Sequence, residues 1–250
     1  MNSFANIKTI AKRELVGYFA SPVAYVFIVI FLLLTGFFTF MLGGFFERGE
    51  ASLNASFFVW HPWLYLFLVP AVGMRLWSEE RRQGTMELLL TMPITAWQAI
   101  LGKFLASWAF LALALVLTFP IVITVNYLGS PDNGVIWASY FGSFLLAGAY
   151  LAVSCMTSAI TRNQVVSFIV SVVICFLLIL AGYPPVTNFL QHVLGMQGWL
   201  VDTIPAFSVM THFDGFQKGV LDSRDFIFFL SVIVFSLFTT GVIIRGHRAG

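Results

Sequence analysis

Charged side chains are scarce in this chain. Its 250 residues include only 13 Lys and Arg and 11 Asp and Glu, whereas 59% of the residues are hydrophobic and the mean hydropathy is +0.92. Soluble globular domains are about 25% charged, so this composition excludes a soluble enzyme, a nucleic-acid-binding protein and a disordered protein. The chain is predicted to be an all-α integral membrane protein that has the lipid bilayer as a partner and does not bind nucleic acid.

Residues that could bind a metal or a nucleotide are also few. The two cysteines lie inside apolar runs, and the four histidines are scattered without the spacing of metal ligands. A phosphate-binding loop requires G-x-x-x-x-G-K-[ST], but Gly102-Lys103 is followed by Phe104. We therefore expect no cofactor in this chain, and any ATP that drives it must bind to a separate subunit.

The long apolar stretches lack groups that could couple transport to an ion gradient. No Asp, Glu, Lys or Arg occurs in residues 104–131, 135–161 or 163–201. Proton-coupled carriers usually keep such groups within the membrane, where they relay protons. The sequence therefore disfavours a carrier that supplies its own energy.

Six segments are long and apolar enough to cross a bilayer, which takes about 20 residues. They are residues 24–43, 57–74, 104–127, 136–159, 164–183 and 226–244. Pro120 predicts a kink in the third span. Before the first span, residues 1–22 show apolar side chains at helical spacing, which favours an amphipathic helix in the membrane interface over an ordinary basic tail.

Lys and Arg are divided unequally between the two sides that six spans define. Ten of the 13 fall on the side of the two termini, and three fall on the other side. Cytoplasmic loops of membrane proteins are enriched in Lys and Arg. Both termini, and the loop that follows the second span, are therefore predicted to be cytoplasmic.

That loop contains the charged segment, residues 75–94 with the sequence RLWSEERRQGTMELLLTMPI. We predict that helix continues from the second span through 75–82 and that Gly84 breaks it. Thr85 is expected to cap a second short helix, Met86 to Met92, which Pro93 ends.

Thr95 and Gln98 then have the spacing of a capping box at the start of the next helix. The plainest interpretation of the charged segment is a solvated loop whose basic residues only fix the topology. Topology requires neither the three glutamates nor the Gly-Thr break, so a helix–break–helix elbow that docks on a partner is favoured.

Two motifs resemble those of type 2 ABC transporter permeases. Residues 78–94, SEERRQGTMELLLTMPI, are similar to the E-x-x-x-G-T-x-E-x-L-L-x-x-P segment of that family. Residues 211–225, THFDGFQKGVLDSRD, are similar to the H-F-x-x-F-x-x-G-V-[IL]-D segment of gliding-motility type members. The resemblance is to the gliding-motility and nitrous-oxide-reductase-maturation subgroup, and it implies a single transmembrane domain over residues 1–250 in the bacterial inner membrane.

The resemblance also implies partners for this chain. The charged segment would contain the coupling helix that docks on a P-loop ATPase subunit, which binds the ATP and magnesium. The residues expected at that interface are Glu79, Glu80, Arg81, Arg82, Gly84, Thr85, Glu87 and Leu88. The complex would hold two ATPase copies and a second permease copy or paralogue, and it leaves room for a periplasmic auxiliary protein.

Residues 184–225, between the fifth and sixth spans, are too apolar and too long for a structureless loop. We expect short helices that form an extracytoplasmic cap. The residues singled out there are His212, Phe213, Asp214, Gly219 and Asp222. They either order the cap or contact a substrate or a periplasmic partner.

The favoured function is that of a non-catalytic permease subunit, which couples ATP hydrolysis in a partner to export. The alternative is mechanotransmission, in which the same complex passes movement to a periplasmic or envelope partner and carries no cargo. A membrane-embedded enzyme is disfavoured because no cluster of His, Asp, Glu or Cys is expected at membrane depth. A large periplasmic subunit, with no stimulation of the ATPase by candidate substrates, would favour mechanotransmission.

Overall fold

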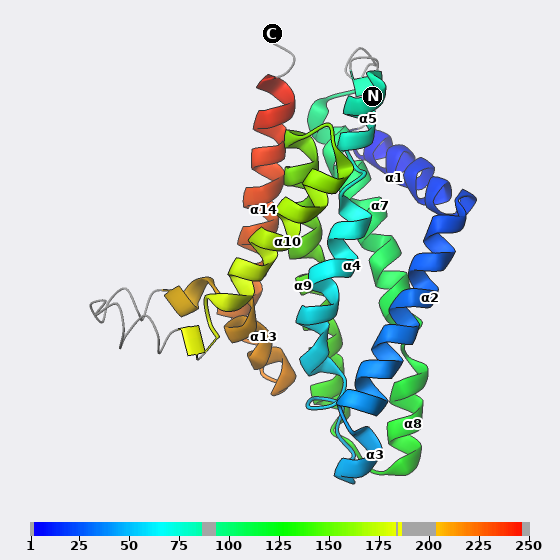
Figure 1. The fold of residues 1–250 in the computed structure, drawn as a ribbon, viewed down its shortest axis with the longest axis vertical. Coiled ribbons are helices and arrows are strands. Elements are labelled where there is room, and N and C mark those ends of the chain that lie inside the picture. The colour runs from blue at the N-terminus through cyan, green and yellow to red at the C-terminus, as the bar shows by residue number, and fades with distance from the viewer. Residues whose placement is uncertain (1–2, 87–93, 184, 187–203, 247–250) are drawn as a thin grey trace.

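The computed structural model describes residues 3–86, 94–183, 185–186 and 204–246. Every regular element among these residues is a helix (Figure 1). The first part of the chain forms α1 (Ser3–Ala20), α2 (Pro22–Phe37), the π-helical turn η1 (Phe38–Leu42), α3 (Phe45–Arg48), the 3-10 turn η2 (Phe58–Trp60), α4 (His61–Gly73) and α5 (Ser78–Gln83). The second part forms α7 (Ala96–Val116), α8 (Pro120–Leu128), α9 (Asn133–Ile160), α10 (Gln164–Leu180), η3 (Ile204–Phe207), α13 (Val209–Gln217) and α14 (Ser223–Gly246).

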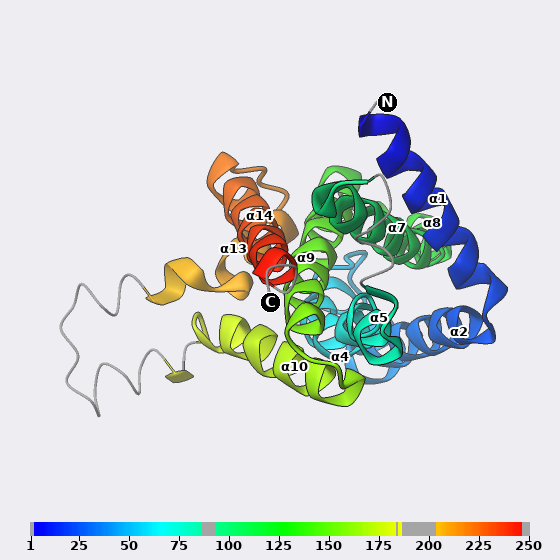
Figure 2. The same cartoon turned by 90° about the horizontal axis from the view of Figure 1, so that it is seen from above.

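Helix α9 is the centre of the bundle. It packs against α4, α7, α10, α13 and α14, and most of its side chains are buried (Figures 1 and 2). Small residues make this contact close, because they let neighbouring backbones and large rings approach. Gly148, for example, lies under the indole of Trp108, which donates a hydrogen bond to the carbonyl of Phe144 at 2.9 Å.

Four helical segments are long and apolar enough to cross a membrane: Pro22–Arg48, Ala96–Leu128, Asn133–Ile160 and Ser223–Gly246. They correspond to the first, third, fourth and sixth expected spans. The expected second span is a 13-residue helix, α4, because Phe58–Trp60 form a 3-10 turn before it. The fifth is α10 with 17 residues, so a crossing by α4 and by α10 stays a prediction.

The expected kink at Pro120 is confirmed. Helix α7 ends at Val116, three residues form a turn, and Pro120 is the first residue of α8. Proline cannot donate a backbone hydrogen bond and its ring clashes with the preceding turn, so it starts a helix more readily than it continues one.

The amphipathic helix expected over 1–22 is observed as α1, which packs along α7. Its position in a membrane interface stays a prediction. The chain turns sharply after α1, because Ser21 caps α2 through Val23 N–H and Pro22 is the first residue of α2.

The two ends of the bundle differ in charge. Helices α1 and α5 and the end of α14 lie at one end, with most of the described basic residues, and α3 lies at the other (Figure 1). Short helices also occur in the expected cap, as η3 and α13, while residues 184 and 187–203 of that cap lie outside the described residues.

Candidate functional site

The charged segment begins with a turn that sequence reasoning did not predict. The expected continuation of helix from the second span through 75–82 is wrong, because α4 ends at Gly73 and α5 starts at Ser78. Ser158 of α9 stabilises the turn between them. Its hydroxyl accepts hydrogen bonds from the N–H groups of Trp77 and Ser78 at 2.9 and 3.0 Å and donates to the Met74 carbonyl at 3.0 Å.

Trp77 holds the same turn through its side chain. The indole is fully buried and its N–H donates to the Cys155 sulfur at 3.2 Å. A buried tryptophan with a satisfied N–H adds a large apolar contact of fixed geometry. The start of α5 is therefore held to α9 by both backbone and side-chain contacts.

The break at Gly84 is confirmed. Gly84 has φ +71°, and its N–H donates to the Glu80 carbonyl, which closes α5 in the left-handed conformation that glycine adopts most easily. Thr85 and Met86 are helical, one residue earlier than expected for the second helix, and the Thr85 hydroxyl donates to the Glu80 carbonyl at 3.5 Å.

The rest of the second helix, with the interface residues Glu87 and Leu88 and the expected stop at Pro93, lies outside the described residues. After it, the capping box is confirmed. Thr95 Oγ1 accepts from Gln98 N–H at 3.3 Å, and Gln98 Oε1 accepts from Thr95 N–H at 3.1 Å.

A buried lysine joins the charged segment to two other helices. The Lys103 ammonium lies 2.8 Å from Glu80 of α5 and 3.7 Å from Glu14 of α1, and 5.3 Å from the ring centre of Trp77. Lys103 is only 5% exposed. Glu80 Oε2 has no hydrogen-bond partner among the described residues. The positive charge of Lys103 is therefore the main interaction that stabilises the Glu80 carboxylate.

Helix α1 is held to α7 by a further contact close to this cluster. The Tyr18 hydroxyl is 2.8 Å from Ser107 Oγ, and its ring stacks on Phe110 at 5.1 Å. Burial raises the pKa of Tyr18 to about 12, against the opposing effect of the Ser107 hydrogen bond. The phenol therefore stays neutral at physiological pH.

The predicted interface residues on α5 point in different directions. Glu80 and Arg81 contact other helices of the bundle. Glu80 pairs with Lys103 of α7, and the Arg81 guanidinium donates a hydrogen bond to the Ala159 carbonyl of α9. Partial burial, together with the positive charge of Arg162, lowers the pKa of Arg81. Glu79 accepts from Gln164 of α10 at 2.9 Å.

The predicted interface residues in the described part of the charged segment differ in exposure, and Glu79, Glu80 and Arg81 are partly buried. Arg82, Gly84 and Thr85 are exposed, and Arg82 pairs with Glu79 at 3.2 Å. The contacts of Ser158, Trp77, Lys103 and Glu14 were not identified from the sequence. Only Lys103 gave a local signal, as a lone charge near the start of an otherwise apolar helix.

The predicted cap residues on α13 form an ordered corner with the start of α14. The two ring nitrogens of His212 lie 2.7 Å from Asp225 Oδ1 and 3.0 Å from the Ala206 carbonyl. Phe213 is buried, and the Asp214 carboxylate pairs with Lys218.

The other two cap residues shape the chain between α13 and α14. Gly219 turns the chain with φ +76°, and Asp222 accepts from Arg224 N–H at 3.0 Å at the start of α14. All five predicted residues therefore lie near one another on neighbouring elements. Their role, either in ordering the cap or in contacting a substrate or a periplasmic partner, stays a prediction.

Within the described ranges, no group of three or more His, Cys, Asp or Glu is placed to hold a metal ion. The charged segment instead joins an exposed turn to α1, α7, α9 and α10 through charged and hydrogen-bonded contacts.

Comparison with known proteins gives one informative match. The family model described as "ABC-2 family transporter protein" matches residues 64–231, about two thirds of the chain. The match spans the charged segment, the central helix α9 and the cap. No curated protein matches the chain.

Proposed function

The chain belongs to the ABC-2 family of transporter proteins, and from this premise we propose that it couples ATP hydrolysis in a separate P-loop ATPase to export across the bacterial inner membrane. It is a transporter membrane subunit by family. In the proposed complex, two permease chains, identical or paralogous, stand on two ATPase copies, with both termini of each permease chain in the cytoplasm.

The observation that best supports this proposal is the attachment of the charged segment. Its exposed face includes Arg82, Gln83, Gly84 and Thr85. Its inner face is held to α1 and α7 by Lys103 and to α9 by Ser158. A loop that served only topology would need no buried ion cluster. A surface that receives force from a partner needs close contacts with the rest of the protein, because closely packed contacts have low compressibility and transmit strain.

Co-purification tests the proposal. The chain is co-expressed with the P-loop ATPase encoded nearest to its gene, and the complex is isolated through a tag on the permease. The proposal requires the ATPase to co-purify, and its ATP hydrolysis in lipid nanodiscs to depend on the permease. Isolation of the permease without any ATPase would contradict it.

Mechanotransmission is the second candidate, and helix α9 favours it. This 28-residue helix would be about 42 Å long at 1.5 Å per residue, longer than the roughly 30 Å hydrocarbon core. One end holds the charged segment through Ser158. At the other end, which packs against the cap, the Ser139 hydroxyl donates to the Val135 carbonyl at 2.8 Å and lies 3.3 Å from the Phe216 carbonyl. One rigid element therefore joins the docking segment to the cap.

The two candidates differ in what should stimulate the ATPase. Export predicts that a transported substrate raises the rate of ATP hydrolysis by the reconstituted complex. Mechanotransmission predicts no response to candidate substrates, but a response to an extracytoplasmic partner protein. Substrate-stimulated hydrolysis with no partner present would remove the second candidate.

A further inference from the structure

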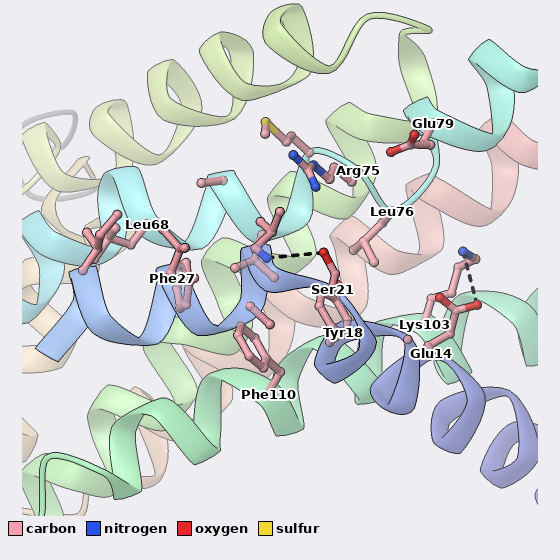
Figure 3. Close-up of a pocket in the computed structure, with 18 residues that line it drawn as sticks. Glu14, Tyr18, Ser21, Phe27, Leu68, Arg75, Leu76, Glu79, Lys103 and Phe110 are labelled. Carbon is pink, nitrogen blue, oxygen red and sulfur yellow. Dashed lines mark hydrogen bonds and ion pairs between the residues drawn. The ribbon is translucent and has the colours of Figure 1, made fainter.

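A cavity of about 500 Å³ lies at the corner where α1 meets α2, and it is also walled by α4 and α7 (Figure 3). This volume is within the usual range for small-molecule sites, about 300–1,000 Å³. Arg75, Leu76 and Glu79 of the charged segment line part of the cavity, but the docking role proposed for that segment does not use it.

One end of the cavity is apolar. Phe27 of α2, Leu68 of α4 and Phe110 of α7 lie together there, away from the charged groups (Figure 3). Val26 and Ile30 of α2 also line it and are partly exposed on the outside of the bundle. Such walls favour a hydrocarbon chain over water, because apolar surface removed from water is stabilising.

The other end is charged, and one of its charges has no counterpart. Glu14 and Lys103 belong to the buried ion cluster, and Glu79 pairs with Arg82. Arg75, which follows α4 at the same end (Figure 3), makes no hydrogen bond or ion pair with another described residue. Its guanidinium is exposed at the cavity and suits a phosphate group, which it can bind in a two-pronged manner.

We propose that this cavity binds one membrane glycerophospholipid, with its phosphate on Arg75 and one acyl chain between α2 and α4. A free phosphate would leave the apolar walls empty, and a plain hydrocarbon would leave Arg75 without a counter-charge. A phospholipid satisfies both ends. The lipid is a resident ligand that fastens the α1–α2 corner to α4, and it is distinct from any cargo.

The test measures thermal unfolding of the delipidated full-length protein in detergent while lipid is added. The probes are dioleoylphosphatidylglycerol, dioleoylphosphatidylethanolamine and dioleoylglycerol, which has the same chains without a phosphate. Both phospholipids are expected to raise the unfolding temperature by several degrees, since a ligand that binds only the folded state stabilises it. Dioleoylglycerol is expected to have little effect.

Two variants separate the charged end from the apolar end. Arg75→Gln is expected to weaken the apparent phospholipid affinity at least tenfold, whereas Arg162→Gln, another exposed arginine that does not line the cavity, leaves it unchanged. Ala71→Phe fills the cavity from α4 and should remove the effect of both phospholipids. If Ala71→Phe does not fold, the comparison of Arg75→Gln with Arg162→Gln and the comparison of the three lipids still test the proposal.

The proposal is overturned if Arg75→Gln binds phospholipid as tightly as the wild type. It is equally overturned if dioleoylglycerol stabilises as well as the phospholipids, or if none of the lipids shifts unfolding. The experiment contains no ATPase, so its failure would leave the proposed permease function untouched.

Discussion

The Lys103 ammonium lies 2.8 Å from the Glu80 carboxylate, which joins the start of α7 to the short helix α5. Glu14 of α1 is the third member of this cluster, 3.7 Å from the same ammonium. These contacts place one buried cation at the point where α1 and α7 meet α5 of the charged segment. In the proposed function, movement of the charged segment reaches the bundle through this cluster.

Replacing Lys103 by Met should destabilise the protein. The change leaves the carboxylate of Glu80 without a counter-charge in a mostly buried position, and breaking a buried pair in this way costs about 3 kcal/mol. The measurement is urea unfolding in detergent, with Lys8→Met as the control because Lys8 is exposed on α1. The double variant Glu80→Gln/Lys103→Met should recover part of the loss. An unchanged midpoint for Lys103→Met would show that the cluster has no structural role.

Ser158→Ala should loosen the turn between α4 and α5. It removes the acceptor for the Trp77 and Ser78 N–H groups, and leaving buried donors without a partner costs about 1–3 kcal/mol. The matched control is Ser154→Ala, one turn earlier on α9, whose hydroxyl donates only to the Tyr150 carbonyl of its own helix. Proteolysis at the charged segment should accelerate in Ser158→Ala alone, and equal rates for the two variants would refute the assignment.

Gly84→Ala should strain the break between α5 and the helix that follows it. An L-residue at φ +71° costs about 1 kcal/mol or more. Gly36→Ala is the control, since Gly36 lies near the end of α2 and a methyl group there meets nothing within 4 Å. The expected result is weaker capture of the ATPase by Gly84→Ala with little change in overall unfolding. Capture equal to that of Gly36→Ala would mean that the break is not needed for docking.

Gly142→Val should push the cap away from the central helix. A Cβ at Gly142 would lie 2.7 Å from Phe216 Cβ of α13, and overpacking of this kind costs about 1–3 kcal/mol. Gly246→Ala, at the end of α14, meets nothing within 4 Å and serves as the control. Differential scanning calorimetry in detergent should show a lower unfolding temperature for Gly142→Val than for the wild type. If Gly142→Val and Gly246→Ala have the same unfolding temperature, the contact between α9 and α13 leaves room for a larger side chain and the prediction is wrong.

The features that sequence reasoning predicted correctly are determined locally. The Thr95–Gln98 capping box, the break at Gly84 and the kink at Pro120 each depend on backbone rules that act over a few residues. Apolar runs likewise placed a helix in every expected span, although they did not reveal that Phe58–Trp60 shorten the second one.

The features that were missed depend on contacts between distant parts of the chain. The turn before α5 exists because Ser158 lies beside it, and the burial of Lys103 becomes visible only when α1 and α5 fold over α7. For the same reason, the pairing of Glu80 with Lys103 was not predicted, and the place of Glu80 on a docking surface stays a prediction. Charge alone identified the segment but could not tell its inner face from its outer face.

The most direct test of the central claim compares ATPase capture by the wild type and by Arg82→Glu/Thr85→Lys. These two side chains are exposed on the described part of the charged segment. The control is Asp214→Asn/Lys218→Gln, an exposed ion pair between α13 and the residue that follows it. Each permease is purified with co-expressed ATPase, and the amount of bound ATPase is measured. Docking of the charged segment on the ATPase predicts at least a tenfold loss of bound ATPase for Arg82→Glu/Thr85→Lys and none for Asp214→Asn/Lys218→Gln. Equal capture by all three proteins would contradict it.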